Sequence, residues 1–125
     1  MYNIYLKEED LLKADQFPVI ALLNEAANSN IIEFAANLAK GIGSGYNYSN
    51  CSFWEDLDEY DQANTPKFDG LLVTNEAGEE IIISYKDLLY YLETLYSCLD
   101  NGDFSRLNEL RAILDSIKTT FRQDC

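Results

Sequence analysis

The sequence predicts an α+β fold that is mainly helical, with residues 1–125 forming a single domain that contains one β-hairpin. Three observations lead to this prediction. Apolar side chains recur at helical spacing in four segments, and two short apolar runs flank a turn. The length of 125 residues is that of one domain, and a composition of 47% hydrophobic and 13% aromatic residues is typical of a packed core.

Two helices are predicted near the N-terminus. Pro18 is favourable in a first turn, where its missing N–H costs nothing, and apolar residues follow at helical spacing as far as Ala26. The polar residues 28–30 interrupt this run and supply a cap for a second helix. Its apolar stripe runs over residues 31–39 and ends at Gly41.

The hairpin is predicted in the middle of the chain, after an irregular stretch over residues 41–69. Leu71-Leu72-Val73 and Ile81-Ile82-Ile83 are separated by Asn75-Glu76-Ala77-Gly78, which contains two turn formers. Consecutive β-branched isoleucines favour a strand over a helix. Because apolar side chains fall on both faces of these strands, we expect a covered sheet.

Two further helices are predicted in the C-terminal part. Ser84 caps the first of them, and Asn101-Gly102 ends it. The last helix begins at Asp103 or Ser105. The apolar stripes of the two helices consist of Leu88, Leu92, Leu95 and Leu99, and of Leu107, Leu110, Leu114, Ile117 and Phe121.

The charge of the chain excludes several classes of function. Twenty-two Asp and Glu against 9 Lys and Arg give a net charge of −13, and there is no histidine. Such a chain does not favour nucleic acid or an anionic membrane, which bind through Lys and Arg. Without histidine, the Ser-His-Asp and Cys-His catalytic arrangements are excluded. Residues 1–105 carry 19 acidic side chains and 5 lysines, a net charge of −14, whereas residues 106–125 carry +1.

The termini and cysteines predict a cytoplasmic protein, and no motif in the sequence predicts a cofactor or a metal. The N-terminus has no basic region followed by an apolar run, so no signal peptide is expected. Cys51, Cys98 and Cys125 are far apart and include no CxxC pair, which is typical of free thiols. The glycine-rich residues 41–45 lack the Lys-Ser/Thr of a phosphate-binding loop, and the spacing of the aspartates in residues 56–61 does not fit a calcium loop.

The segment from Glu55 to Asp61 carries the clearest functional signal. It has five carboxylates in seven residues and follows Trp54, the only tryptophan. One interpretation is a solvated acidic face with the tryptophan packed in the core. The other is a surface that binds a basic protein, with aromatic anchors surrounded by carboxylates. The candidate binding residues are Tyr46, Tyr48, Trp54, Glu55, Asp56, Asp58, Glu59, Tyr60 and Asp61.

The order of these short motifs also resembles a known family. The run GSGYNYSNC at residues 43–51 is followed by FWEDLD at residues 53–58, by Phe68-Asp69-Gly70 and by EIIISY at residues 80–85. This pattern is similar to the immunity proteins of bacterial contact-dependent growth inhibition, the CdiI family, and within it to the group that neutralises ribonuclease toxins. The resemblance covers residues 2 to about 99, in order and without large gaps.

The resemblance implies a cytosolic antitoxin that binds, one to one, the toxic C-terminal domain of a CdiA-type effector. That domain is expected to be a small basic ribonuclease, EndoU-like or RNase A-like, whose RNA-binding or active-site cleft is occluded. The charge agrees independently, because an acidic protein imitates the polyanion that such a toxin binds. Two other functions remain open: an acidic nucleic-acid mimic that inhibits a DNA-processing enzyme, and a small hydrolase that uses a carboxylate pair.

Overall fold

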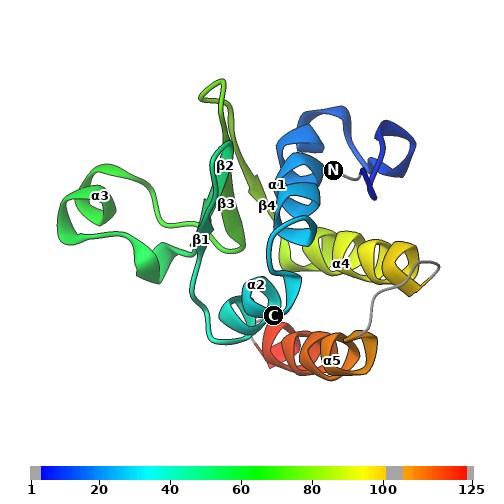
Figure 1. Cartoon of the computed structure of the whole chain (residues 1–125). Coiled ribbons are helices and arrows are strands. Elements are labelled where there is room, and N and C mark those ends of the chain that lie inside the picture. The colour runs from blue at the N-terminus through cyan, green and yellow to red at the C-terminus, as the bar shows by residue number, and fades with distance from the viewer. Residues whose placement is uncertain (1–3, 101–105, 124–125) are drawn as a thin grey trace.

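The computed structural model describes residues 4–100 and 106–123, the last three by their backbone alone. In this part of the chain, four strands and five α-helices confirm the predicted α+β, mainly helical fold (Figure 1). Three 3-10 turns, η1 (Glu8–Asp10), η2 (Ala14–Gln16) and η3 (Trp54–Asp56), accompany them. The helices are α1 (Phe17–Ala27), α2 (Ile31–Ala39), α3 (Glu59–Asn64), α4 (Tyr85–Asp100) and α5 (Leu107–Gln123), and the strands are β1 (Ser44–Gly45), β2 (Ser49–Ser52), β3 (Leu71–Asn75) and β4 (Glu80–Ile83).

The strands form one antiparallel sheet in the order β1-β2-β3-β4. The predicted hairpin is confirmed as β3 and β4. A second hairpin, β1 with β2, lies in the stretch for which the sequence predicts irregular structure, so one hairpin becomes two. Serine, glycine and asparagine dominate these two short strands. They therefore lack the apolar alternation that marks a strand in a sequence.

The two faces of the sheet have different surroundings. Leu71, Val73 and Ile83 are fully buried on the face that packs against α1. Leu72 pairs with Ile82 on the opposite face, where 48% of Ile82 is exposed. Helices α1 and α4 lie on one side of the sheet and α3 on the other (Figure 1). The expectation of a covered sheet therefore holds for the α1 face only.

Polar caps begin two helices where the sequence predicts them. The Asn30 side chain accepts a hydrogen bond from the Glu33 N–H (3.1 Å) at the start of α2. Ser84 Oγ accepts one from the Asp87 N–H (3.2 Å) at the start of α4. These bonds satisfy N–H groups that have no partner inside the helix, and so they fix where each helix starts.

The apolar stripes of α4 and α5 face the core, as predicted. Leu107 is half-buried. Three predicted features lie outside the described residues: the helix end at Asn101-Gly102, the helix start at Asp103 or Ser105, and the Phe121 side chain. Helix α5 packs against α2 and α4, so the C-terminal part of the chain closes the core on the side away from the strands (Figure 1). The fully or almost fully buried members are Leu88, Leu92, Leu95, Leu99, Leu110, Leu114 and Ile117.

A hydrogen-bond network attaches the N-terminal segment to α4. The hydroxyl of the fully buried Tyr91 donates to Gln16 Oε1 (2.6 Å) and accepts from the Leu12 N–H (2.9 Å). Gln16 Nε2 in turn donates to Asp87 Oδ2 (2.9 Å). The neighbouring Tyr90 is 40% exposed. Tyr90 and Tyr91 therefore lie on different sides of α4.

The buried Asn24 holds the start of the chain against α1. Its Oδ1 accepts from the N–H groups of Tyr5 (3.0 Å) and Leu6 (2.9 Å), and its Nδ2 donates to the Leu6 carbonyl (2.9 Å). Leu6 is only 1% exposed and belongs to no helix or strand, so its backbone N–H and carbonyl need partners. The Asn24 amide supplies both. This arrangement lets the Leu6 side chain enter the core.

We expect Asn24→Ala to lower the free energy of unfolding by about 2–4 kcal/mol, because it leaves the buried Leu6 N–H and carbonyl without partners. Chemical denaturation measures the change. Asn108→Ala, at an exposed position of α5, is the matched control and should stay within about 0.5 kcal/mol of the wild type. Equal stabilities of the two variants would contradict the role given to Asn24.

Candidate protein-binding surface

Residues 53–69 connect β2 to β3 and project from the sheet as an arm, which contains η3 and α3 (Figure 1). The half-buried Trp54 packs edge-on against Phe68, with ring centroids 5.7 Å apart and an interplanar angle of 90°. Gln62 Nε2 donates to the Trp54 carbonyl (3.2 Å), which ties α3 back to η3. The tryptophan thus supports the arm from within, and its ring is only partly available to a partner.

One carboxylate fixes the base of the arm. Asp56 Oδ2 accepts hydrogen bonds from the N–H groups of Phe53 and Gly43, both at 2.8 Å. A Cβ atom at Gly43 would lie 2.1 Å from the Cys51 carbonyl oxygen, so only glycine allows this approach. The arm returns to β3 through Gly70, which has a φ of +112°. Asp56 therefore has a structural role in addition to its charge.

The other acidic side chains of the arm point into solvent. Glu55, Asp58, Glu59 and Asp61 are exposed. Asp58 Oδ1 accepts from the Asp61 N–H (2.8 Å) and caps α3. Within the described part of the chain, no Lys or Arg side chain forms an ion pair with any of the arm's carboxylates. None of these carboxylates is therefore held in a close ion pair there, although Lys40 and Lys67 line a pocket together with Glu55.

The described cations of α5, by contrast, are paired. Arg111 binds Glu93 through two hydrogen bonds of 2.7 and 2.8 Å and also reaches Asp115 (2.8 Å). Its guanidinium lies 4.8 Å from the centre of the Tyr96 ring, and Lys118 Nζ is 3.5 Å from Glu93. The hydrogen bonds from Arg111 lower the pKa of the Glu93 carboxyl. These ion pairs lie on α4 and α5, away from the arm (Figure 1).

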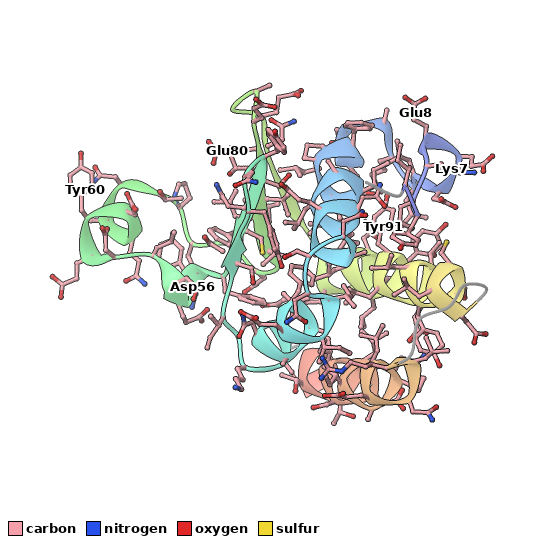
Figure 2. The ribbon with its side chains drawn as sticks, viewed as in Figure 1. Lys7, Glu8, Asp56, Tyr60, Glu80 and Tyr91 are labelled. Atoms are coloured by element: carbon pink, nitrogen blue, oxygen red, sulfur yellow. The ribbon has the colours of Figure 1, made fainter. Side chains whose placement is uncertain are left out.

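The three candidate tyrosines have different surroundings. Tyr60 is 75% exposed on α3 and points away from the molecule (Figure 2). Tyr48 is 59% exposed, and its N–H donates to Glu25 Oε2 (3.0 Å), while Glu25 Oε1 is buried without a hydrogen-bond partner. Tyr46 is half-buried against Phe34, with ring centroids 6.2 Å apart. Tyr60 is therefore the aromatic side chain best placed to contact a partner.

The structure divides the candidate residues into two groups. Residues 54–61 lie together on the arm. Tyr48 precedes β2 whereas Trp54 follows it, and six residues of extended chain span roughly 20 Å. Tyr46 and Tyr48 therefore do not extend the surface of the arm, although the sequence places them only a few residues before it.

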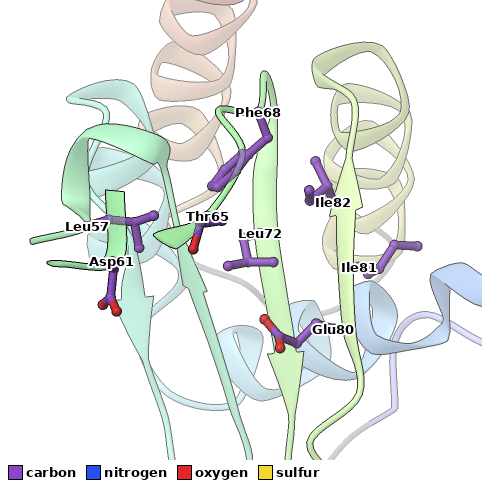
Figure 3. Close-up of a pocket in the computed structure, with 8 residues that line it drawn as sticks. All are labelled: Leu57, Asp61, Thr65, Phe68, Leu72, Glu80, Ile81 and Ile82. Carbon is purple, nitrogen blue, oxygen red and sulfur yellow. The ribbon is translucent and has the colours of Figure 1, made fainter. Parts of the chain in front are cut away.

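A groove between the arm and the outer face of the sheet is a feature that the sequence does not predict (Figure 3). Its volume is about 490 Å³. Leu72 and Ile82 line the groove from β3 and β4. The only sign of this pair in the sequence is that apolar residues fall on both faces of these strands. The groove is lined by Leu57, Asp61 and Phe68 from the arm and by Leu72, Glu80 and Ile82 from the sheet.

The described cysteines are free and poorly suited to nucleophilic chemistry. Burial raises the pKa of the Cys51 thiol to about 11, and desolvation also raises that of Cys98. Since the thiolate is the reactive form, neither thiol is activated near neutral pH. Cys125 lies outside the described residues.

Residues 4–100 and 106–123 contain neither a metal-binding cluster nor a membrane-spanning helix. No three Cys, Asp or Glu side chains there come together as a group that could hold a metal ion. No helix in the same residues has the length and apolar character needed to cross a membrane.

Comparisons with known proteins gave no relative. No protein-family model matches the chain, and no match was found among curated proteins or among solved structures.

The two roles of Asp56 are separable by experiment. We expect Asp56→Ala to speed amide hydrogen exchange at Gly43 and Phe53 by about tenfold or more, because both N–H groups lose their acceptor. Asp56→Asn keeps an oxygen acceptor without the charge, so protection should be largely retained. Glu55→Gln is the control and should leave both amides unchanged. If the alanine variant exchanged like the wild type, Asp56 would not hold the arm.

Burial has a measurable effect on Tyr46. Desolvation raises the pKa of its phenol from 10.0 to about 12. Because the folded-state pKa is raised, its contribution to stability is complete below pH 10 and is lost as the pH rises through about 12. In a spectrophotometric titration, Tyr46→Phe should remove one late-ionising phenol. An unchanged number of late-ionising tyrosines would contradict this assignment.

Proposed function

We propose that this protein is a cytoplasmic immunity protein that binds, one to one, the basic ribonuclease toxin domain of a CdiA-type effector. The observation that carries the proposal is the acidic arm, a projecting element whose carboxylates have no cationic partner in the described part of the chain. Its motifs FWEDLD and Phe68-Asp69-Gly70 are part of the resemblance to the ribonuclease-neutralising immunity proteins.

The proposed mechanism is occlusion of the toxin's RNA-binding or active-site cleft. A ribonuclease must present positive charge to the phosphates of its substrate. An acidic projecting element imitates that polyanion and is attracted to the same cleft. Electrostatic steering accelerates association by about 10–10³ at low salt, which favours an inhibitor that must act before the toxin cleaves RNA.

Tight binding also needs desolvated anchors, since charges at the rim of an interface mainly set rate and specificity. Tyr60 is the large aromatic side chain that the arm exposes most, and carboxylates surround it on α3. Aromatic residues of this kind commonly dominate the binding energy of an interface. In this proposal the protein acts by binding, without catalysis or a cofactor.

The test uses the C-terminal domain of the protein encoded immediately upstream, which the proposal expects to be a basic ribonuclease. Association rates are measured at several salt concentrations for the wild type and for Glu55→Lys/Glu59→Lys. We expect the arm variant to associate at least about tenfold more slowly at low salt, with a weaker salt dependence and loss of protection in cells.

The matched control is Glu8→Lys/Glu9→Lys. It makes the same change of net charge at exposed positions in the N-terminal segment, on the other side of the molecule (Figure 2). Its association rate should be within about threefold of the wild-type rate, because only the net charge has changed. Equal effects of the two variants would remove the arm from the interface. Failure of the wild type to bind or inhibit the domain would overturn the proposed function itself.

A further inference from the structure

The groove combines an apolar floor with two carboxylates. Leu72 and Ile82 form a register pair on the outer face of β3 and β4, and Phe68 closes one end from the arm (Figure 3). Asp61 and Glu80 lie toward the other end, one on the arm and one on β4. Both carboxylates are exposed, and among the described residues neither is paired with a Lys or Arg.

The spacing of these groups follows from the strand itself. Glu80 and Ile82 are two residues apart on β4 and therefore point to the same face, roughly 7 Å apart. The groove floor thus offers the apolar side chain of Ile82 and, next to it, the negative charge of Glu80. The groove volume of about 490 Å³ falls within the range of about 300–1,000 Å³ found for ligand sites in proteins.

We propose that this groove receives an arginine side chain from the basic partner. The methylene stem packs on Leu72 and Ile82, and the guanidinium lies between the carboxylates of Asp61 and Glu80. Arginine fits better than lysine because its planar fork can bind two carboxylates at once and is more weakly hydrated than an ammonium group. The identity of the partner as a toxin rests on the proposed function, but the chemistry of the groove does not.

The groove also makes the geometry of the arm functionally relevant. Leu57 and Asp61 reach the groove from the arm, whose base is held by Asp56. A pre-formed groove binds with less loss of conformational freedom than one that must close around its ligand. The arm would therefore supply both the charge that attracts a partner and one wall of the site that receives its arginine.

A peptide assay tests the groove without the toxin. The probes are acetyl-Leu-Arg-Leu-amide and the same peptide with citrulline in place of arginine, which keeps the shape and removes the charge. Binding is followed in methyl NMR spectra of the full chain. We expect the arginine peptide to shift the methyl signals of Leu57, Leu72 and Ile82 and to bind at least about fivefold more tightly than the citrulline peptide.

Two matched pairs of variants locate the binding. Ile82→Thr keeps a β-branched residue in the strand and should lower the affinity for the arginine peptide by about threefold or more. Ile42→Thr makes the same change at a position of similar exposure, 46% against 48%, outside the groove, and should have no effect. Glu80→Gln should likewise weaken binding, whereas Glu76→Gln in the exposed β3–β4 turn should not.

The inference is overturned if the citrulline peptide binds as tightly as the arginine peptide, if the shifted methyl groups lie outside the groove, or if both members of a pair behave alike. These outcomes are separate from a failure of the proposed function, which is measured on the toxin domain with Glu55 and Glu59 variants that do not line the groove. If the protein protects cells but does not bind the arginine peptide, the inference about the groove is wrong and the proposed function stands.

Discussion

The two hydrogen bonds accepted by Asp56 determine the form of the surface described above. They connect the start of the arm to the loop before β1, at a point where Gly43 passes too close to the Cys51 carbonyl for any other residue. Beyond this base, Trp54 packs on Phe68, and Asp61 of α3 lines the groove together with Leu72 of the sheet. The groove lies between the arm and the side chains of Leu72 and Ile82 on the sheet.

The distribution of charge over the molecule is the second constraint on how a partner can bind. Arg111 forms one ion pair with Glu93 of α4 and another with Asp115 of its own helix, α5. Among the described residues, no Lys or Arg forms an ion pair with a carboxylate of the arm. The exposed carboxylates of the arm therefore contribute to the attraction of a basic partner before any close contact forms.

Much of the fold can be predicted from residue patterns. Pro18, the polar break at residues 28–30 and the cap at Ser84 mark helices that the structure contains. The hairpin of β3 and β4 follows from its β-branched runs. Strands β1 and β2 are not predictable in this way, because residues such as Ser49 and Asn50 become strand through pairing with β3 and not through their own propensity.

The candidate surface is predictable only in part. The density of carboxylates at residues 55–61 is visible in the sequence. The structural role of Asp56 is not, because one of its two hydrogen bonds reaches Gly43, 13 positions away. The groove depends on the path of the arm across the sheet, which no local pattern encodes. The separation of Tyr48 from Trp54 likewise depends on the intervening residues being strand.

The central claim is that this protein occupies the RNA-binding cleft of a ribonuclease toxin. Competition is its most direct test: a catalytically inactive toxin domain is titrated with an RNA oligonucleotide at increasing concentrations of this protein. The account predicts that the apparent dissociation constant for RNA rises in proportion to the free protein, with no ternary complex. Simultaneous binding of RNA and protein to the same toxin domain would contradict it.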